Sequence, residues 1–142
     1  MVKQISVFLE NKEGRLAEVT KTIADSGINI RAMSIADTTD FGILRLIVND
    51  PERASKVLID SEFTVTVKEV LAVGISDEPG ALSKTLSVMM KDGIAIEYMY
   101  AFVGKCNGNA LVIFKVSDNE KAAASLKQSG IEVIDGQELY NL

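Results

Sequence analysis

Two six-residue segments, 11–16 and 77–82, contain residue types that suit a small charged ligand. Each starts with Asn or Asp, has glycine fourth and leucine sixth, and lies between an apolar run and a helical pattern. The pattern predicts that Asn11 and Asp77 cap the following helices and that Pro79 occupies a first helical position. Gly14 and Gly80 leave the backbone accessible, and N–H groups at a helix start attract anions. An ordinary capped turn is the alternative for either segment alone.

The composition argues against several kinds of chemistry. The chain has no histidine, so it lacks the usual general base and the commonest transition-metal ligand. Its single cysteine, Cys106, lies in a predicted turn without an identifiable basic partner, which favours a spectator thiol over a nucleophile. We therefore expect no enzymatic activity, no cofactor and no metal site.

Charge and length narrow the choice of partners and compartment. The 142 residues include 20 acidic and 15 basic ones, a formal net charge of −5, without a long basic stripe. Nucleic acid and anionic membranes are therefore poor candidate partners. The first residues lack the apolar segment of a secretory signal, and no apolar run approaches the roughly 18 residues of a membrane span. A lone cysteine also fits a reducing compartment, so we expect a cytoplasmic protein.

The two segments belong to a repeat that extends along the whole chain. Subtracting 14 from 80 gives 66, and the same offset relates further apolar and glycine positions in the two halves: Leu16 and Leu82, Gly27 and Gly93, Ile28 and Ile94, Ile30 and Ile96. Farther on the offset is 68, as for Asp50 and Asp118 or Leu58 and Leu126. The second copy therefore has two extra residues, which we place near the turn at 104–108. Such a repeat implies one structural unit made twice.

Each copy shows the element order β-α-β-β-α-β. In the first copy we expect strands near 5–9, 30–36, 43–48 and 63–67, with helices after Gly14 and after the Asp50 cap. In the second we expect strands at 70–75, 96–102, 111–116 and 132–134, with helices after Gly80 and at 118–129. Only Lys68 or so separates the last strand of one copy from the first of the next. The predicted domains are therefore residues 1–67 and 68–142.

This element order predicts an α+β fold, with two ferredoxin-like βαββαβ units in tandem. Each unit has an antiparallel sheet with both helices on one face. Leu44, Leu46 and Val48 are expected to point to the helices, and Met89 and Met90 to fill the core. A unit of about 70 residues is only marginally stable alone, so we expect the two units to pack side by side.

The repeat resembles the ACT domain, twice over nearly the whole chain. The likeness rests on the short polar residue, glycine and leucine after the first strand, and on Gly27 to Ile30 entering the second. It implies a small regulatory module that binds an amino acid between ACT units, usually as an appendage of a biosynthetic enzyme. No enzyme domain is attached here, so a free-standing pair is implied.

The same resemblance implies which residues contact the ligand, between the first loop of one unit and the second strand of another. The implied residues are Asn11, Gly14, Arg15, Leu16, Asn29 and Ile30 from the first copy, and Asp77, Pro79, Gly80, Ala81, Leu82, Ala95 and Ile96 from the second. Ala95 replaces the polar Asn29, and Glu13 stands where the second copy has Pro79, so two such sites would differ. We favour the second, because the Asp77 carboxylate suits a ligand ammonium better than an amide does.

Two functions are carried forward. The first is a non-catalytic sensor for a small ligand, an amino acid, with allosteric regulation of amino acid metabolism, a homodimeric state and a possible partner enzyme. The second is a ligand-free interaction module that assembles with a biosynthetic enzyme. Metal chaperones and RNA-binding domains share the ferredoxin-like frame. They are disfavoured because the chain lacks paired cysteines and a basic-aromatic strand.

Overall fold

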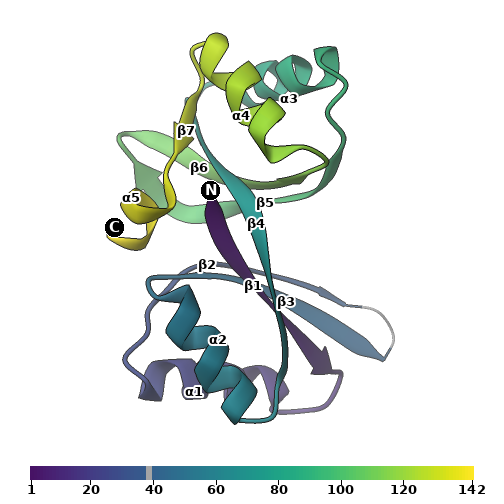
Figure 1. Ribbon diagram of the computed structural model, residues 1–142, viewed down its shortest axis with the longest axis vertical. Coiled ribbons are helices and arrows are strands. Elements are labelled where there is room, and N and C mark those ends of the chain that lie inside the picture. The colour runs from purple at the N-terminus through teal and green to yellow at the C-terminus, as the bar shows by residue number, and fades with distance from the viewer. Residues whose placement is uncertain (38–39) are drawn as a thin grey trace. The chain divides into compact units, whose positions relative to one another are not determined.

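Contacts within the chain define two units (Figure 1). The computed structural model describes residues 1–37 and 40–142. The N-terminal unit comprises Lys3–Lys68 with Asn141, and the C-terminal unit comprises Glu69–Tyr140 with Met1–Val2 and Leu142.

The N-terminal unit is an antiparallel sheet with two helices. Its elements are β1 (Val2–Glu10), α1 (Arg15–Asp25), β2 (Ile30–Asp37), β3 (Phe41–Val48), α2 (Pro51–Asp60) and the first part of β4 (Thr64–Ile75). The strand order is β2-β3-β1-β4. β3 pairs antiparallel with both β1 and β2. This is the predicted β-α-β-β-α-β unit.

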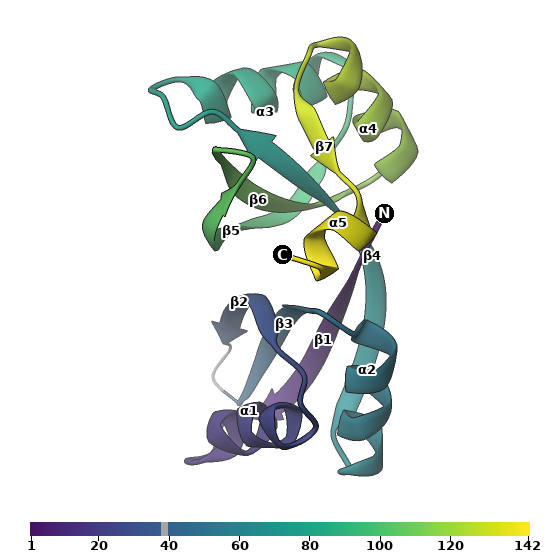
Figure 2. The ribbon, with the colours of Figure 1, turned by 90° about the vertical axis from the view of Figure 1, so that its left-hand side faces the viewer.

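The C-terminal unit repeats that arrangement and adds one helix. Its elements are the remainder of β4, then α3 (Ala81–Lys91), β5 (Ile96–Cys106), β6 (Asn109–Val116), α4 (Asn119–Gln128), β7 (Glu132–Ile134) and α5 (Gly136–Tyr140). The strand order β7-β4-β6-β5 leaves β5 at one end. In Figure 2, α3 and α4 lie on one face of this sheet and α5 on the other.

Each unit has an apolar core between its sheet and its first two helices. Leu44, Leu46 and Val48 of β3 pack with residues of β1, α1 and α2, as predicted. In the C-terminal unit, Phe114 of β6 and Met89 of α3 occupy the corresponding core. The register also repeats, since Met33 pairs with Leu46 and Met99 with Phe114. A shift between Ala101 and Lys105 falls close to the predicted two-residue insertion. The tandem α+β prediction is confirmed, whereas side-by-side packing stays a prediction.

Two predictions, on strand continuity and on Met90, were wrong, and one helix was not predicted. The expected interruption at Lys68 is absent, because β4 continues from Thr64 to Ile75 as one strand. Consecutive residues of a strand share one extended backbone conformation, so the chain passes from the first unit to the second without a turn. Helix α5 was not predicted, since five residues are too few for a clear helical period. Met90 is 73% exposed, whereas Met89 is fully buried.

Of the predicted caps, Asp50 is confirmed and Asn11 and Asp77 are wrong. Asp50 caps α2, and the equivalent Asp118 caps α4, accepting hydrogen bonds from the N–H groups of Arg53 and Lys121 at 3.1 Å. Helices α1 and α3 begin after Gly14 and Gly80, without a side-chain cap. Both glycines are left-handed, with φ of 85° and 88°, a conformation in which glycine avoids the Cβ penalty. Pro79 therefore precedes the cap position.

Candidate functional site

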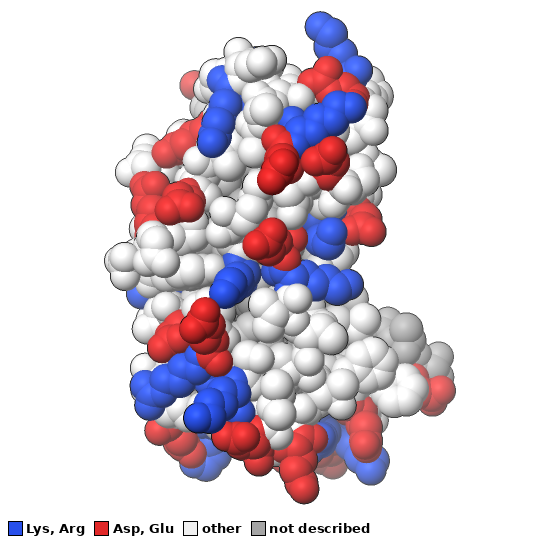
Figure 3. All heavy atoms as spheres, viewed as in Figure 1, with Lys and Arg blue, Asp and Glu red and all other residues white. Residues whose placement is uncertain are grey.

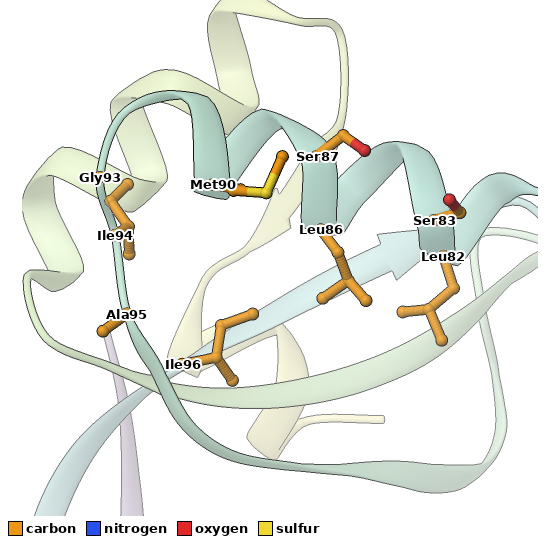
Figure 4. Close-up of a pocket in the computed structure, with 9 residues that line it drawn as sticks. All are labelled: Leu82, Ser83, Leu86, Ser87, Met90, Gly93, Ile94, Ala95 and Ile96. Atoms are coloured by element: carbon orange, nitrogen blue, oxygen red, sulfur yellow. The ribbon is translucent and has the colours of Figure 1, made fainter.

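The C-terminal unit has an open groove between α3 and the start of β5 (Figure 4), with a volume of about 690 Å³. Ligand pockets commonly measure about 300–1,000 Å³. The lining residues come from α3, the following turn and β5, and are Leu82, Ser83, Leu86, Ser87, Met90, Gly93, Ile94, Ala95 and Ile96. Figure 4 shows Leu82, Leu86 and Met90 along α3, with the side chains of Leu82 and Leu86 pointing to the side on which Ile96 of β5 lies.

Local backbone geometry holds the two walls of the groove. Gly93 is left-handed, with φ 71°, and its N–H donates to the Met90 carbonyl at 3.0 Å. This is a glycine helix end of the common kind. Two hydrogen bonds with Ser117 hold Ala95 in place. The Ala95 N–H donates to Ser117 Oγ at 3.1 Å, and the Ser117 N–H donates to the Ala95 carbonyl at 2.9 Å. The start of β5 is therefore tied to the end of β6.

The lining is chemically simple. Its large side chains are apolar, its hydroxyls are those of Ser83 and Ser87, and none of the nine described residues that line it carries a charge. A groove of this kind favours an apolar group, because burying an unpaired charge costs far more than burying carbon. It can bind a ligand, and it offers no paired nucleophile and base.

The structure brings three predicted residues of the second copy together, because Leu82, Ala95 and Ile96 all line this groove. Asp77 lies in the loop before α3, where its carboxylate accepts a hydrogen bond from Lys105 Nζ at 3.3 Å. Pro79 and Gly80 are exposed in the same loop. The Ala81 N–H donates to the Glu78 carbonyl at 3.2 Å. One N–H expected to meet an anion is thus used within the loop.

A second, more polar cavity of about 200 Å³ lies at the other side of the start of α3. It is lined by Gly74, Ile75, Ser76, Ala81, Lys84, Thr85, Asn109, Gly130, Ile131 and Glu132. The predicted residue Ala81 belongs here and not to the groove. Both carboxylate oxygens of Glu132 already accept hydrogen bonds, from Asn107 at 2.8 Å and from Asn109 at 3.1 Å. We therefore place the candidate site in the larger groove.

The six predicted residues of the first copy lie on the equivalent elements of the N-terminal unit. Asn11 N–H donates to the Asp40 carbonyl at 3.0 Å, and Gly14 precedes α1. Arg15 pairs with Glu18 at 2.6 Å, and its guanidinium lies 4.8 Å from the Phe63 ring centroid. Leu16 is exposed at the start of α1. These contacts hold the Arg15 side chain against its own unit.

The second strand of the N-terminal unit starts as β5 does. Asn29 N–H donates to Asn49 Oδ1 at 2.9 Å, and Asn49 N–H donates to the Asn29 carbonyl at 3.1 Å. Asn29 thus occupies the place of Ala95. Ile30 packs partly against the core. Each copy therefore holds this strand by one backbone–backbone hydrogen bond and one backbone N–H that donates to a side-chain oxygen.

Sequence reasoning missed Leu86 and Met90 as groove residues. Their positions, with Leu82, follow the i, i+4, i+8 spacing that places side chains on one helix face. Met89 and Thr85 lie on the buried face instead. The signal was a second apolar stripe on α3, which is distinguishable only once Met89 is assigned to the core.

Cys106 lies away from the groove lining, in a polar cluster of the C-terminal unit. Its thiol is buried, and Sγ lies 3.8 Å from Glu138 Oε1. Burial raises the pKa of the Cys106 thiol above its ordinary value of 9.0, and the nearby carboxylates of Glu138 and Glu132 raise it further. A buried thiol with a raised pKa is a poor nucleophile. The spectator assignment fits this geometry.

The charged surface and the helix lengths show no sign of a metal site or a membrane span in the described residues. On the face in Figure 3, acidic and basic side chains are interspersed. Among residues 1–37 and 40–142, no three His, Cys, Asp or Glu residues gather closely enough to hold a metal ion. Over the same residues, every helix is too short or too polar to cross a membrane.

Comparison with known proteins identifies the family. The family model described as an ACT domain pair matches residues 1–142. The chain belongs to that family. No curated protein matches it.

Three solved structures share this fold. Protein BT0572 from Bacteroides thetaiotaomicron is 43% identical, with a TM-score of 0.92, and the match covers 99% of this chain and 96% of that one. The regulatory subunit of aspartate kinase from Thermus thermophilus is 16% identical, with a TM-score of 0.65 and 90% coverage of both chains. The corresponding subunit from Thermus flavus is 16% identical, with a TM-score of 0.60, covering 90% of this chain and 92% of that one. At 16% identity the likeness shows the fold alone.

Proposed function

We propose that the protein is a non-catalytic regulatory sensor that binds an amino acid, with the α3–β5 groove of the C-terminal unit as part of its site. The observation that carries the proposal is the groove itself. Leu82, Ala95 and Ile96 line one cavity of about 690 Å³ within the C-terminal unit, whereas the ACT resemblance implied them as ligand contacts between different units. The names of the two Thermus proteins, regulatory subunits of aspartate kinase, support a regulatory role.

The proposed ligand site has an apolar part and a charged part. The groove takes the ligand side chain, while the loop at 77–80 meets its charged end. We keep Asp77 as the proposed partner of the ligand ammonium. Its side chain is 72% exposed and its ion pair with Lys105 is also exposed. Such pairs are weak in water, so a ligand can replace Lys105 at little cost.

Calorimetry with the twenty amino acids tests the proposal. We expect at least one to bind, and Leu82→Ala to weaken that binding by about tenfold or more, the size of a lost methylene contact in an apolar pocket. Leu16→Ala, at the equivalent position of the first copy and equally exposed (39% against 40%), should weaken binding less, because the second copy is the favoured site. Asp77→Ala should also weaken binding. Failure of every amino acid to bind, or equal binding by Leu82→Ala, would refute the site.

The biological setting follows from the same proposal. We propose that the two ACT units are residues 1–67 and 68–142, that the protein is a cytoplasmic homodimer, and that it reports amino acid levels to an enzyme of amino acid metabolism. Sedimentation velocity with and without the bound amino acid tests the dimer. A monomer at every concentration contradicts that part and leaves ligand binding unaffected.

One observation favours a ligand-free interaction module as a second candidate. Phe8 and Phe41 of the N-terminal unit have ring centroids 5.2 Å apart, although they are 47% and 43% exposed. Exposed aromatic pairs are unusual outside contact surfaces. Thermal shift separates the two functions, because a ligand that binds only the folded state raises the melting temperature. The module predicts no shift with any amino acid.

A further inference from the structure

We infer that the α3–β5 groove selects an amino acid with an uncharged, apolar side chain, and that Leu86 and Met90 are the residues that set this preference. The inference rests on the proposed function, since it names the ligand class of the same site. Its basis is a comparison of α3 with α1, its counterpart in the other copy.

The two helices have the same frame, so residues 66 apart are equivalent. Each begins after a left-handed glycine, with φ and ψ of 85° and −9° at Gly14 and of 88° and −9° at Gly80. Each is followed by another left-handed glycine, with φ of 72° at Gly27 and 71° at Gly93. Leu82 therefore corresponds to Leu16, Leu86 to Thr20, and Met90 to Ala24.

The first of these three equivalent positions is leucine in both helices, and the other two differ. In the N-terminal unit, the Thr20 hydroxyl donates to the carbonyls of Leu16 and Ala17, so it is used by its own helix. Leu86 and Met90 replace that hydroxyl and the single methyl of Ala24 with two long apolar side chains. Leu82 and Ile96 have apolar equivalents in the first copy, so only the part of the wall made by Leu86 and Met90 is a property of the second copy.

Met90 is not needed for folding in the way its neighbour is. Met89 is fully buried in the core, whereas the Met90 side chain is 73% exposed and lines the groove. Its flexible thioether can adapt to the shape of an apolar group. Leu82, Leu86 and Ile96 complete a surface on which a charged side chain would lose water without gaining a partner.

Titration calorimetry on the full chain tests the inference, with leucine, isoleucine and methionine compared with serine, aspartate and lysine. We expect the three apolar amino acids to bind at least about tenfold more tightly than the three polar ones. Met90→Ala should weaken binding of the apolar set by about tenfold while the melting temperature of the free protein changes little, because Met90 is exposed. Leu86→Thr with Met90→Ala recreates the first copy and should remove most of the preference.

Lys91→Ala is the control, because Lys91 is exposed on the same helix and does not line the groove. It should leave binding unchanged. The inference would be overturned if the wild-type protein bound the polar set more tightly than the apolar set. It would also be overturned if Met90→Ala and the double variant bound the apolar set as tightly as the wild type does. In either case the proposed function stands. If none of the twenty amino acids binds, the proposed function itself fails.

Discussion

The two units are copies with the same frame, yet their exposed surfaces differ. Their helix starts, helix ends and strand registers agree closely. The units differ at the exposed Met90 against Ala24, and at the partly buried Leu86, which packs against the edge of the core, against Thr20. Core packing constrains volume and shape at each buried position, whereas surface positions can change without loss of the fold. Duplication therefore conserved the scaffold and left one surface free to become a groove.

The two units also differ on the sheet face that does not form the apolar core. Phe8 pairs with Ile43, and Gly74 pairs with Leu111, so Gly74 occupies the place of Phe8. A Cβ at Gly74 would come within 2.7 Å of Glu132 Oε2. The C-terminal unit thus has a carboxylate, bound by Asn107 and Asn109, where the N-terminal unit has an aromatic pair. One copy exposes rings, and the other satisfies a polar cluster.

The largest expected effect separates the core of α3 from its groove face. Met89→Ala should lower the free energy of unfolding by about 2–5 kcal/mol, because it leaves a cavity in a fully buried site. Met90→Ala should change it by less than about 0.5 kcal/mol. Urea denaturation measures both variants. Equal losses would show that Met90 packs in the core after all.

A smaller loss of stability, of equal size in the two units, is expected when the glycines that follow α1 and α3 are replaced. Gly27 and Gly93 have φ of 72° and 71°, with nothing within 4 Å of an added Cβ. Alanine there must adopt a left-handed conformation, which costs about 1–2 kcal/mol. Gly27→Ala and Gly93→Ala should therefore destabilise the protein equally in urea denaturation. A difference above about 1 kcal/mol would contradict the equivalence of the two helices.

The smallest expected effect concerns pH and belongs to the C-terminal unit alone, because Cys106 is the only cysteine. Its folded pKa is raised above 9.0. As the pH rises, the thiol of the unfolded chain therefore loses its proton before the thiol of the folded protein does. The contribution of Cys106 to the free energy of unfolding is thus complete below about pH 9 and decreases at higher pH. Comparing unfolding at pH 7 and pH 10 for wild type and Cys106→Ala isolates this contribution. The variant should lose less stability between the two pH values, and an identical loss would contradict the assignment.

Three of the nine residues that line the groove were among the predicted ligand contacts, and the other six were not. Leu82, Ala95 and Ile96 were identified from the repeat and the ACT resemblance. Asp77 was expected to cap α3, but it accepts a hydrogen bond from Lys105, which is 28 residues away. A cap is a local interaction that a short motif can suggest. A partner that lies beyond α3, on β5, depends on how the chain folds back, and no local pattern contains it.

Sequence alone determined the repeat, the element order and the buried stripes, because apolar residues recurring at the period of a helix or strand leave few ways to cover them. Only the tertiary structure decided that β4 runs unbroken from Thr64 to Ile75 and that Met90 faces solvent while Met89 is buried. It also decided that α3 and the start of β5 enclose a groove. Such features depend on which surfaces meet in space, and periodicity does not specify that.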